Sequence, residues 1–392
     1  MFHTATPEDV KAGKVTDVYF ERTLRILKAK GIDKRVRAEF MVKGFPRGWE
    51  WGVLAGVEEA ARLMEGLAVN VRCMAEGTVF YPLQPVMEIE GRYSEFGAYE
   101  TALLGLICQA SGIATKAARI RKLAGGRLVI SFGARRMHPV LAPMIERNAY
   151  VGGCDGVSVL KSAELIGTDP MGTMPHALVI MMGDTVEATL AFDEVIEKSV
   201  KRTSLIDTFN DEKFEAVRVA EAMGGRLFAV RLDTPASRRG NFYRILEEVR
   251  WELDLRGFKD VKLFVSGGID EDDIPALNPL VDGYGIGTSI SNAPVVDFAM
   301  DIIEVEGRPL AKRGKWSGSK SVLRCAGCGH DGIAPRAAGI TVCGCGGERA
   351  DILAPLIEDG RVVAELPSAT LLRGRVLRSV SALPGPVTGE IR

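Results

Sequence analysis

The chain has 392 residues, with 50 Lys and Arg against 51 Asp and Glu, and a formal net charge of −1. Apolar residues make up 46% and charged residues 26%, a composition that excludes disordered, collagen-like and coiled-coil proteins. A net charge near zero creates no global field that would attract nucleic acid, so we expect no nucleic-acid partner.

No apolar stretch approaches the roughly 18 residues that a membrane-spanning helix needs. The longest uninterrupted run covers only residues 177–182, and residues 1–10 lack the hydrophobic core of a signal peptide. We therefore expect a cytoplasmic protein without a membrane partner. The length predicts two or three domains.

The N-terminal part, residues 1–110, is expected to form a small α/β sandwich domain. Helical periodicity predicts helices over residues 17–30 and 56–67. Residues 78–90 are expected to form edge strands packed on those helices, because two prolines interrupt the extended pattern. A long helical stretch over residues 100–124 is predicted to break at its Ser-Gly pair.

Residues 111–300 are predicted to form a parallel βα barrel, irregular and of about seven strands. Short β-branched runs alternate there with helix-length segments, which is typical of parallel βα units. Such barrels place their chemistry at the carboxyl ends of the strands. The seven runs are residues 127–132, 156–160, 177–182, 204–208, 227–232, 261–265 and 284–290.

Two glycine-rich turns, residues 264–270 and 282–289, follow or lie within predicted strands. Glycine lets backbone N–H groups approach a phosphate closely, so these turns are candidates for phosphate binding; the alternative is a pair of tight barrel turns. Neither turn matches a dinucleotide fingerprint or a P-loop. The candidate residues are Gly267, Gly268, Gly285, Gly287 and Thr288.

Charged side chains follow two other predicted strands. Arg231 could bind phosphate or carboxylate, and Asp233 could accept hydrogen bonds from sugar hydroxyls. Phe132 and Arg135 together suggest a stacking surface and a carboxylate clamp for a planar acidic ring. The alternative for the segment at 230–240 is an exposed loop of ion pairs. His176 is a candidate too, although a lone histidine is more often structural.

Four of the seven cysteines lie close together in the predicted C-terminal domain, residues 301–392, which we expect to pack back on the N-terminal domain. Thiolates on two glycine-containing turns can converge on Zn²⁺, and four sulfur ligands leave no open position, so the zinc would be structural. Reduced free thiols are the alternative. The four residues are Cys325, Cys328, Cys343 and Cys345.

Several long motifs in the same order resemble the nicotinate phosphoribosyltransferase family. The resemblance implies that nicotinate and phosphoribosyl diphosphate react to nicotinate mononucleotide and diphosphate, in a homodimer or higher homo-oligomer, as part of NAD salvage. Its motifs are TDVY at 16–19, SGIAT at 111–115, FGARRMHP at 132–139, GTMPHA at 172–177, IDTFND at 206–211, VRLDTPASRRG at 230–240, VSGGID at 265–270, GIGTSI at 285–290 and AKRGKWSGSK at 311–320.

The resemblance also implies residue roles. Tyr19 resembles an aromatic residue that reaches into the neighbouring subunit and stacks on the pyridine, with Phe132 on the other face. Arg135 is similar to the nicotinate clamp, and Arg231 and Asp233 to the diphosphate and ribose contacts.

The resemblance further assigns the phosphate-binding loops to the glycine-rich turns. His176 matches a histidine that some members phosphorylate with ATP, although its neighbours depart from the usual motif. Asp207 is our candidate for stabilising an oxocarbenium-like transition state, with Mg²⁺ on the leaving diphosphate. Asp207 could equally cap the helix that follows.

Two alternatives stay open. Quinolinate phosphoribosyltransferases resemble this chain in the helix at 111–115 but carry a DTRKTxP segment where this chain has FGARRMHP. A catalytically inactive, zinc-bearing binding protein on the same fold is the second alternative.

Overall fold

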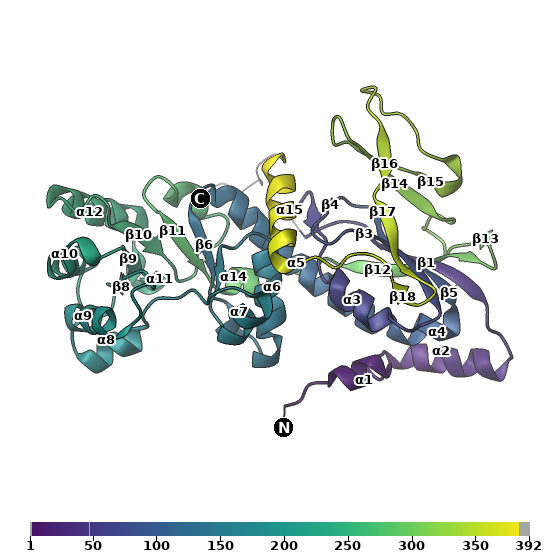
Figure 1. Ribbon diagram of the computed structural model, residues 1–392, viewed down its shortest axis with the longest axis horizontal. Coiled ribbons are helices and arrows are strands. Elements are labelled where there is room, and N and C mark those ends of the chain that lie inside the picture. Colours follow the sequence, from purple (N-terminus) through teal and green to yellow (C-terminus); the bar gives the residue numbers. More distant parts are fainter. Residues whose placement is uncertain (1, 47, 384–392) are drawn as a thin grey trace. The chain divides into compact units, whose positions relative to one another are not determined.

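The computed structural model describes residues 2–46 and 48–383, and the chain divides into two compact units (Figure 1). Unit 1 comprises Met1–Thr115 and Pro294–Ser379, and unit 2 comprises Lys116–Ala293 and Val380–Arg392. No helix among the described residues is long and apolar enough to cross a membrane. The fold is mixed α/β.

Unit 1 contains a seven-stranded sheet in the order β13-β12-β1-β5-β3-β17-β18, in which the paired strands are antiparallel. Side chains of α3 (Val57–Met64), α4 (Tyr93–Phe96) and the first part of α5 (Glu100–Ala124) form a common core with those of the sheet. The strands of the sheet are β1 (Arg35–Val42), β3 (Val69–Met74), β5 (Pro85–Arg92), β12 (Phe298–Val305), β13 (Arg308–Pro309), β17 (Leu353–Glu358) and β18 (Arg361–Val362). Helices α1 (Pro7–Lys11) and α2 (Val18–Ala29) also belong to unit 1, and α15 (Ala369–Ser381) begins in it.

The predicted edge position is wrong for residues 85–90, whereas β4 (Val79–Phe80) does lie at the edge of a two-stranded sheet. Strand β5 lies in the middle of the sheet, between β1 and β3, and Pro85 is tolerated because it is the first residue of the strand. Strand β1 was not predicted at all, although residues 35–40 alternate charged and apolar side chains. Its charged face is satisfied by ion pairs with β5, such as Arg37 with Glu90 at 2.6 Å.

Helix α5 (Glu100–Ala124) is continuous, so the predicted break at Ser111 and Gly112 is wrong. The Ser111 hydroxyl accepts a hydrogen bond from the backbone N–H of Ala55 at 3.0 Å. A Cβ at Gly112 would lie 2.3 Å from the carbonyl oxygen of Pro294. The two residues therefore provide a hydrogen bond and close packing within the helix instead of ending it.

Two smaller sheets complete unit 1. Strand β2 (Gly52–Val53) pairs with β4 (Val79–Phe80). A three-stranded sheet has the order β15-β14-β16 and carries the turns that bear the cysteine cluster. Its strands are β14 (Lys320–Cys325), β15 (Asp331–Pro335), which is followed by η5 (Arg336–Ala338), and β16 (Arg349–Asp351).

Unit 2 contains a six-stranded sheet in the order β7-β6-β11-β10-β9-β8, and every strand pair in it is parallel. In Figure 1 helices flank the strands of this unit. The strands are β6 (Leu128–Ser131), β7 (Gly156–Val157), β8 (Thr203–Leu205), β9 (Ala229–Leu232), β10 (Lys262–Val265) and β11 (Gly283–Ile286); the helices are α6 (Ala142–Val151), α7 (Leu160–Ile166), α8 (His176–Met182), α9 (Thr185–Val195), α10 (Glu212–Met223), α11 (Ala236–Arg239), α12 (Phe242–Leu255), α13 (Ile274–Leu277) and α14 (Thr288–Ser291).

The parallel sheet agrees with the predicted βα architecture as a half-barrel, and the predicted strand at 177–182 is wrong. That segment is helix α8, which ends at the left-handed Gly183. Only Val179 of the helix is fully buried, and Met181 is 85% exposed. A short apolar run cannot be assigned to strand or helix by periodicity alone, which explains the error.

Candidate active site

The predicted polar residues of unit 2 follow the carboxyl ends of its parallel strands. Phe132 follows β6, Asp207 follows β8, Asp233 follows β9, and the two glycine-rich turns follow β10 and occupy the end of β11. Because parallel strands present the same end to the same edge of a sheet, residues far apart in sequence converge there.

His176, the first residue of α8, lies between two carboxylates. Its Nε2 atom is 3.6 Å from Asp207 Oδ2 and 3.7 Å from Asp233 Oδ2. Its Nδ1 atom is 3.0 Å from the hydroxyl of Thr208, which fixes the orientation of the ring. The histidine side chain is 38% exposed, so it can reach a ligand while it contacts both acids.

Asp207 has an unusual environment for a carboxylate. Its side chain is only 2% exposed, and neither carboxylate oxygen has a hydrogen-bond partner of normal geometry among the described residues. Burial raises the pKa of Asp207, while the neighbouring His176 opposes that shift. An under-satisfied buried carboxylate at a strand end is a strong candidate for stabilising a developing positive charge.

Arg231, Ser266 and Asp233 form one hydrogen-bonded chain. The Arg231 Nε donates to the Ser266 hydroxyl at 2.9 Å, and that hydroxyl donates to Asp233 Oδ1 at 2.6 Å. Arg231 also donates to the hydroxyl of Thr173, and its Nη2 lies 3.4 Å from Asp233 Oδ2. The guanidinium and the carboxylate are thus held in fixed positions beside His176.

An aromatic surface adjoins this chain. The Arg231 guanidinium carbon lies 5.4 Å from the centroid of the Phe132 ring, within cation–π distance. A Cβ at Gly285 would lie 2.4 Å from two atoms of that ring, so only glycine leaves room for it. Arg135, in the turn after Phe132, is exposed and available to a ligand.

The first glycine turn has the conformation that phosphate loops need. Gly267 and Gly268 are exposed and have φ angles of +83° and +72°, which other residues rarely adopt. A Cβ at Gly267 would also lie 2.9 Å from Asp233 Oδ1. In the second turn, Gly287 precedes α14 and Thr288 is exposed.

Sequence reasoning missed the residues that hold the site in place. Ser266 and Thr208 lie inside motifs that were recognised, so their side chains could have been singled out as hydrogen-bond partners. Lys116 had no signal, because it lies on the long helix α5; its ammonium is 2.6 Å from Asp270 Oδ1. Ser289 donates to the same oxygen at 2.7 Å and so ties the two glycine turns together.

Tyr19 belongs to unit 1, on α2, and its side chain is 57% exposed. Val18 and Ile26 of the same helix are exposed as well. The role expected of Tyr19, stacking on the pyridine in the neighbouring subunit, stays a prediction.

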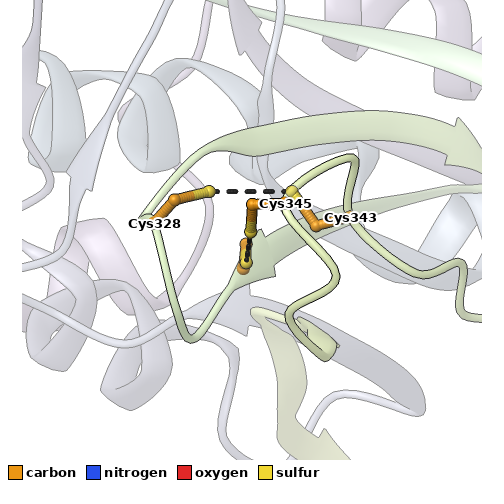
Figure 2. Close-up of side chains that lie close together, drawn as sticks. Cys328, Cys343 and Cys345 are labelled. Carbon is orange, nitrogen blue, oxygen red and sulfur yellow. Dashed lines mark hydrogen bonds between the residues drawn. The ribbon is translucent and has the colours of Figure 1, made fainter.

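The four C-terminal cysteines converge, and they could hold a metal ion (Figure 2). Their sulfur atoms all lie within 4.8 Å of one another, with Cys325 and Cys345 3.5 Å apart and Cys328 and Cys343 3.6 Å apart. Tetrahedral zinc with Zn–S bonds of about 2.3 Å places sulfur atoms about 3.8 Å apart, so the donor set fits zinc. A backbone N–H of Cys345 lowers the pKa of Cys343 to about 6, whereas the side chains of the other three cysteines raise the pKa of Cys328.

Comparisons with known proteins identify the family. A family model described as the N-terminal domain of quinolinate phosphoribosyl transferase matches residues 17–111, and the model for its C-terminal domain matches residues 113–301. A nicotinate phosphoribosyltransferase of Mycobacterium tuberculosis is 30% identical over 80% of this chain and 78% of its own length. The chain belongs to this family of phosphoribosyltransferases. It is an enzyme of the pentosyltransferase class, and the predicted family is confirmed.

Solved structures agree on the fold. A nicotinate-nucleotide pyrophosphorylase from Pyrococcus furiosus has 54% sequence identity and a TM-score of 0.96, covering 98% of this chain and 99% of that one. The human nicotinic acid phosphoribosyltransferase has a TM-score of 0.72 at 19% identity, covering 95% of this chain and 96% of its own, and so supports the fold alone.

The predicted reaction with nicotinate needs correction. Both matching family models describe quinolinate phosphoribosyltransferase, and the 54% identical structure is named nicotinate-nucleotide pyrophosphorylase. These findings favour the alternative, a quinolinate phosphoribosyltransferase, against which the FGARRMHP segment had been taken as evidence. Relatives near 30% identity are nevertheless named nicotinate phosphoribosyltransferases. A short segment that departs from one family's motif is weak ground for excluding that family's substrate.

Proposed function

We propose that this protein is a quinolinate phosphoribosyltransferase. It would transfer the phosphoribosyl group of phosphoribosyl diphosphate to the ring nitrogen of quinolinate, and release diphosphate and carbon dioxide to give nicotinate mononucleotide. The observation that carries the proposal is the convergence of His176, Asp207 and Asp233 beside an arginine stacked on Phe132, at the carboxyl ends of parallel strands. The match of both domains to quinolinate phosphoribosyltransferase supports the choice of acid.

Binding of the acid needs an aromatic surface and several cations. Quinolinate is a planar ring with two adjacent carboxylates, so it suits the ring face of Phe132 and the guanidinium groups of Arg231 and Arg135. Arg136, also exposed in the turn after β6, offers a further cation.

The transfer step breaks the bond between the anomeric carbon and the diphosphate oxygen, and the ring-nitrogen lone pair forms the new C–N bond. Positive charge develops on the ribose, where the carboxylates of Asp207 and Asp233 would stabilise it. The Gly267–Gly268 turn and the turn at 285–288 would bind the 5′-phosphate through backbone N–H groups. Mg²⁺ bound to the diphosphate would offset the charge of the leaving group, and carboxylate oxygens such as those of Asp233 suit that ion.

Decarboxylation completes the reaction. The bond from ring carbon 2 to its carboxylate breaks, carbon dioxide leaves, and the electron pair remains on carbon 2 next to the cationic ring nitrogen. A proton then adds to that carbon. We infer that His176, whose ring is oriented by Thr208, would deliver it. ATP coupling through His176, the homodimer and the cytoplasmic location stay predictions.

The test supplies phosphoribosyl diphosphate and Mg²⁺ with quinolinate, nicotinate or nicotinamide in separate reactions and identifies the mononucleotide and the gas released. We expect nicotinate mononucleotide and one carbon dioxide per turnover from quinolinate. Turnover of nicotinate without turnover of quinolinate would refute the proposal.

Arg135→Ala tests the acid-binding role in the same assay. Because Arg135 is exposed, its loss should leave the fold intact, raise the KM for quinolinate about tenfold or more, and change the KM for phosphoribosyl diphosphate little. Arg244→Ala, an exposed arginine on α12, is the matched control. Equal effects on both KM values would argue against a role for Arg135 in acid binding.

A further inference from the structure

Unit 1 contains a cavity of about 680 Å³ that no residue of the proposed reaction lines. It lies between strands β12 and β13, the segment 316–320, and strand β15 with the turn after it. Its volume falls within the range of roughly 300–1,000 Å³ that is typical of small-molecule sites. Part of its wall is the AKRGKWSGSK motif, to which the proposed function gives no role.

The segment that carries Trp316 is anchored by a buried ion pair. Lys320 is 5% exposed, and its ammonium lies 2.8 Å from the carboxylate of Glu39, which is 1% exposed. The same ammonium donates to the carbonyl oxygens of Trp316 at 2.9 Å and Gly318 at 3.1 Å. The backbone of this loop is thus anchored to a buried ion pair at two of its carbonyl groups.

Trp316 itself is 61% exposed on this anchored loop. Pro309, Ile333 and Pro335 line the same cavity and make its walls mainly apolar. An indole beside apolar walls offers a stacking surface for a flat ring, and base–aromatic stacking contributes about 1–3 kcal/mol per base.

Of the cationic side chains that line the cavity, Arg37 and Lys320 already form ion pairs, and Arg336 remains for a ligand. Arg37 is already surrounded by three carboxylates, those of Glu88, Glu90 and Glu304, at 2.6–3.2 Å. Lys320 is neutralised by Glu39. Arg336 is exposed and has no ion pair within 4 Å in the part of the chain that the structure describes. The cavity therefore combines an exposed indole, apolar walls and one uncompensated guanidinium.

We propose that this cavity binds a purine nucleoside phosphate, with the base stacked on Trp316 and the phosphate bound by Arg336. The flat base matches the indole and the prolines, and a phosphate suits the two-pronged donors of a guanidinium. A second copy of this chain, or a peptide, is the competing occupant of an exposed aromatic residue.

The test titrates the protein with AMP or with adenosine and measures the quenching of tryptophan fluorescence. Neither ligand can donate a phosphoryl group to His176. We expect saturable quenching by both ligands and tighter binding of AMP. Trp316→Phe should remove most of the quenching, and Trp316→Ala should weaken binding about tenfold. Trp251→Ala, which removes an exposed tryptophan of α12, should leave binding unchanged.

Arg336→Gln distinguishes the contribution of the phosphate to binding from that of the base. It should weaken AMP about tenfold and leave adenosine unchanged, because only the phosphate is expected to contact this residue. Arg361→Gln, on strand β18 outside the cavity, is the matched control. Three outcomes overturn the proposal: no quenching at millimolar AMP, AMP displaced by phosphoribosyl diphosphate, or a smaller oligomer in sedimentation caused by Trp316→Ala.

Discussion

At the scale of single residues, the candidate site is built from groups that are costly for the fold. Asp207 is buried without a hydrogen-bond partner of normal geometry among the described residues, and burial raises its pKa. A carboxyl group with a raised pKa in the folded state contributes stability at low pH and loses that contribution as the pH rises through the folded-state value. Removing the charge should therefore stabilise the protein and harm the reaction.

We predict that Asp207→Asn raises the melting temperature by a few degrees at pH 8, because it removes a desolvated charge. The difference from the wild type should shrink as the pH falls through the raised pKa of Asp207, because the folded wild type then holds a neutral carboxyl group. Scanning calorimetry at several pH values, together with initial rates, tests this. A variant that melts lower at pH 8, or that keeps its full rate, would contradict the assignment of Asp207.

Gly285 leaves the space that the Phe132 ring occupies at the aromatic surface of the site. Gly285→Ala would place a Cβ 2.4 Å from two atoms of the Phe132 ring, so the ring or the backbone must move. We predict a loss of about 1–3 kcal/mol in the free energy of unfolding and a higher KM for the pyridine acid. Denaturant unfolding and steady-state kinetics measure both. Gly225→Ala, where a Cβ would meet nothing within 4 Å, should change neither.

At the scale of elements, helix α5 begins among acidic groups of unit 1. Desolvation, followed by the nearby Asp301, raises the pKa of Glu100 to about 7. Since this value lies above the ordinary one, the contribution of Glu100 to stability is full below about pH 4.5 and is lost as the pH rises through 7.

Glu100→Gln stays neutral, so we predict that it becomes more stable than the wild type as the pH increases from 5 to 8. Its half-exposed position keeps the effect modest. Thermal melts across this range measure the difference, with Glu194→Gln, an exposed acid on α9, as the control. A difference that does not vary with pH would rule out titration of Glu100.

The strands and helices that the sequence predicted best are those whose pattern is local. The parallel strands β6, β8, β9, β10 and β11 lie where β-branched runs end in glycine or charge. The strand predicted at residues 177–182 was wrong because a six-residue apolar run has no period that distinguishes a strand from a helix. The helix break predicted at Gly112 was wrong because the residue that packs against this glycine is almost two hundred positions away in the sequence. The strand ends could be predicted for the same reason as the strands, since each polar residue directly follows an apolar run.

The contacts within the site could not be predicted. The distances from His176 to its two acids depend on three separate loops, and the hydrogen bond from Ser266 to Asp233 joins two strands. Sequence patterns indicate which residues reach one edge of a sheet, but not which of them touch.

At the scale of the whole molecule, we expect the stability of the three-stranded sheet to depend on a metal ion bound by the cysteine cluster. We predict one zinc per chain by elemental analysis of the purified protein, and a lower melting temperature after treatment with a chelator. Cys345→Ser should lose the metal, whereas Cys108→Ser, outside the cluster, should retain it. Protein that has four titratable thiols and little metal would contradict the zinc assignment.

Unit 2 interrupts unit 1 in the chain, and this order constrains synthesis. Strand β1 pairs with β12, and β3 pairs with β17, so the central sheet of unit 1 requires partners made after residues 116–293. A nascent chain can form the parallel sheet of residues 116–293 first, while strands β1 and β3 in the first 115 residues still lack the partners β12 and β17. We therefore expect a chain truncated near residue 300 to contain a soluble part with the parallel sheet and an N-terminal segment that is prone to aggregate. Chaperones would be needed most while residues 116–293 are being translated.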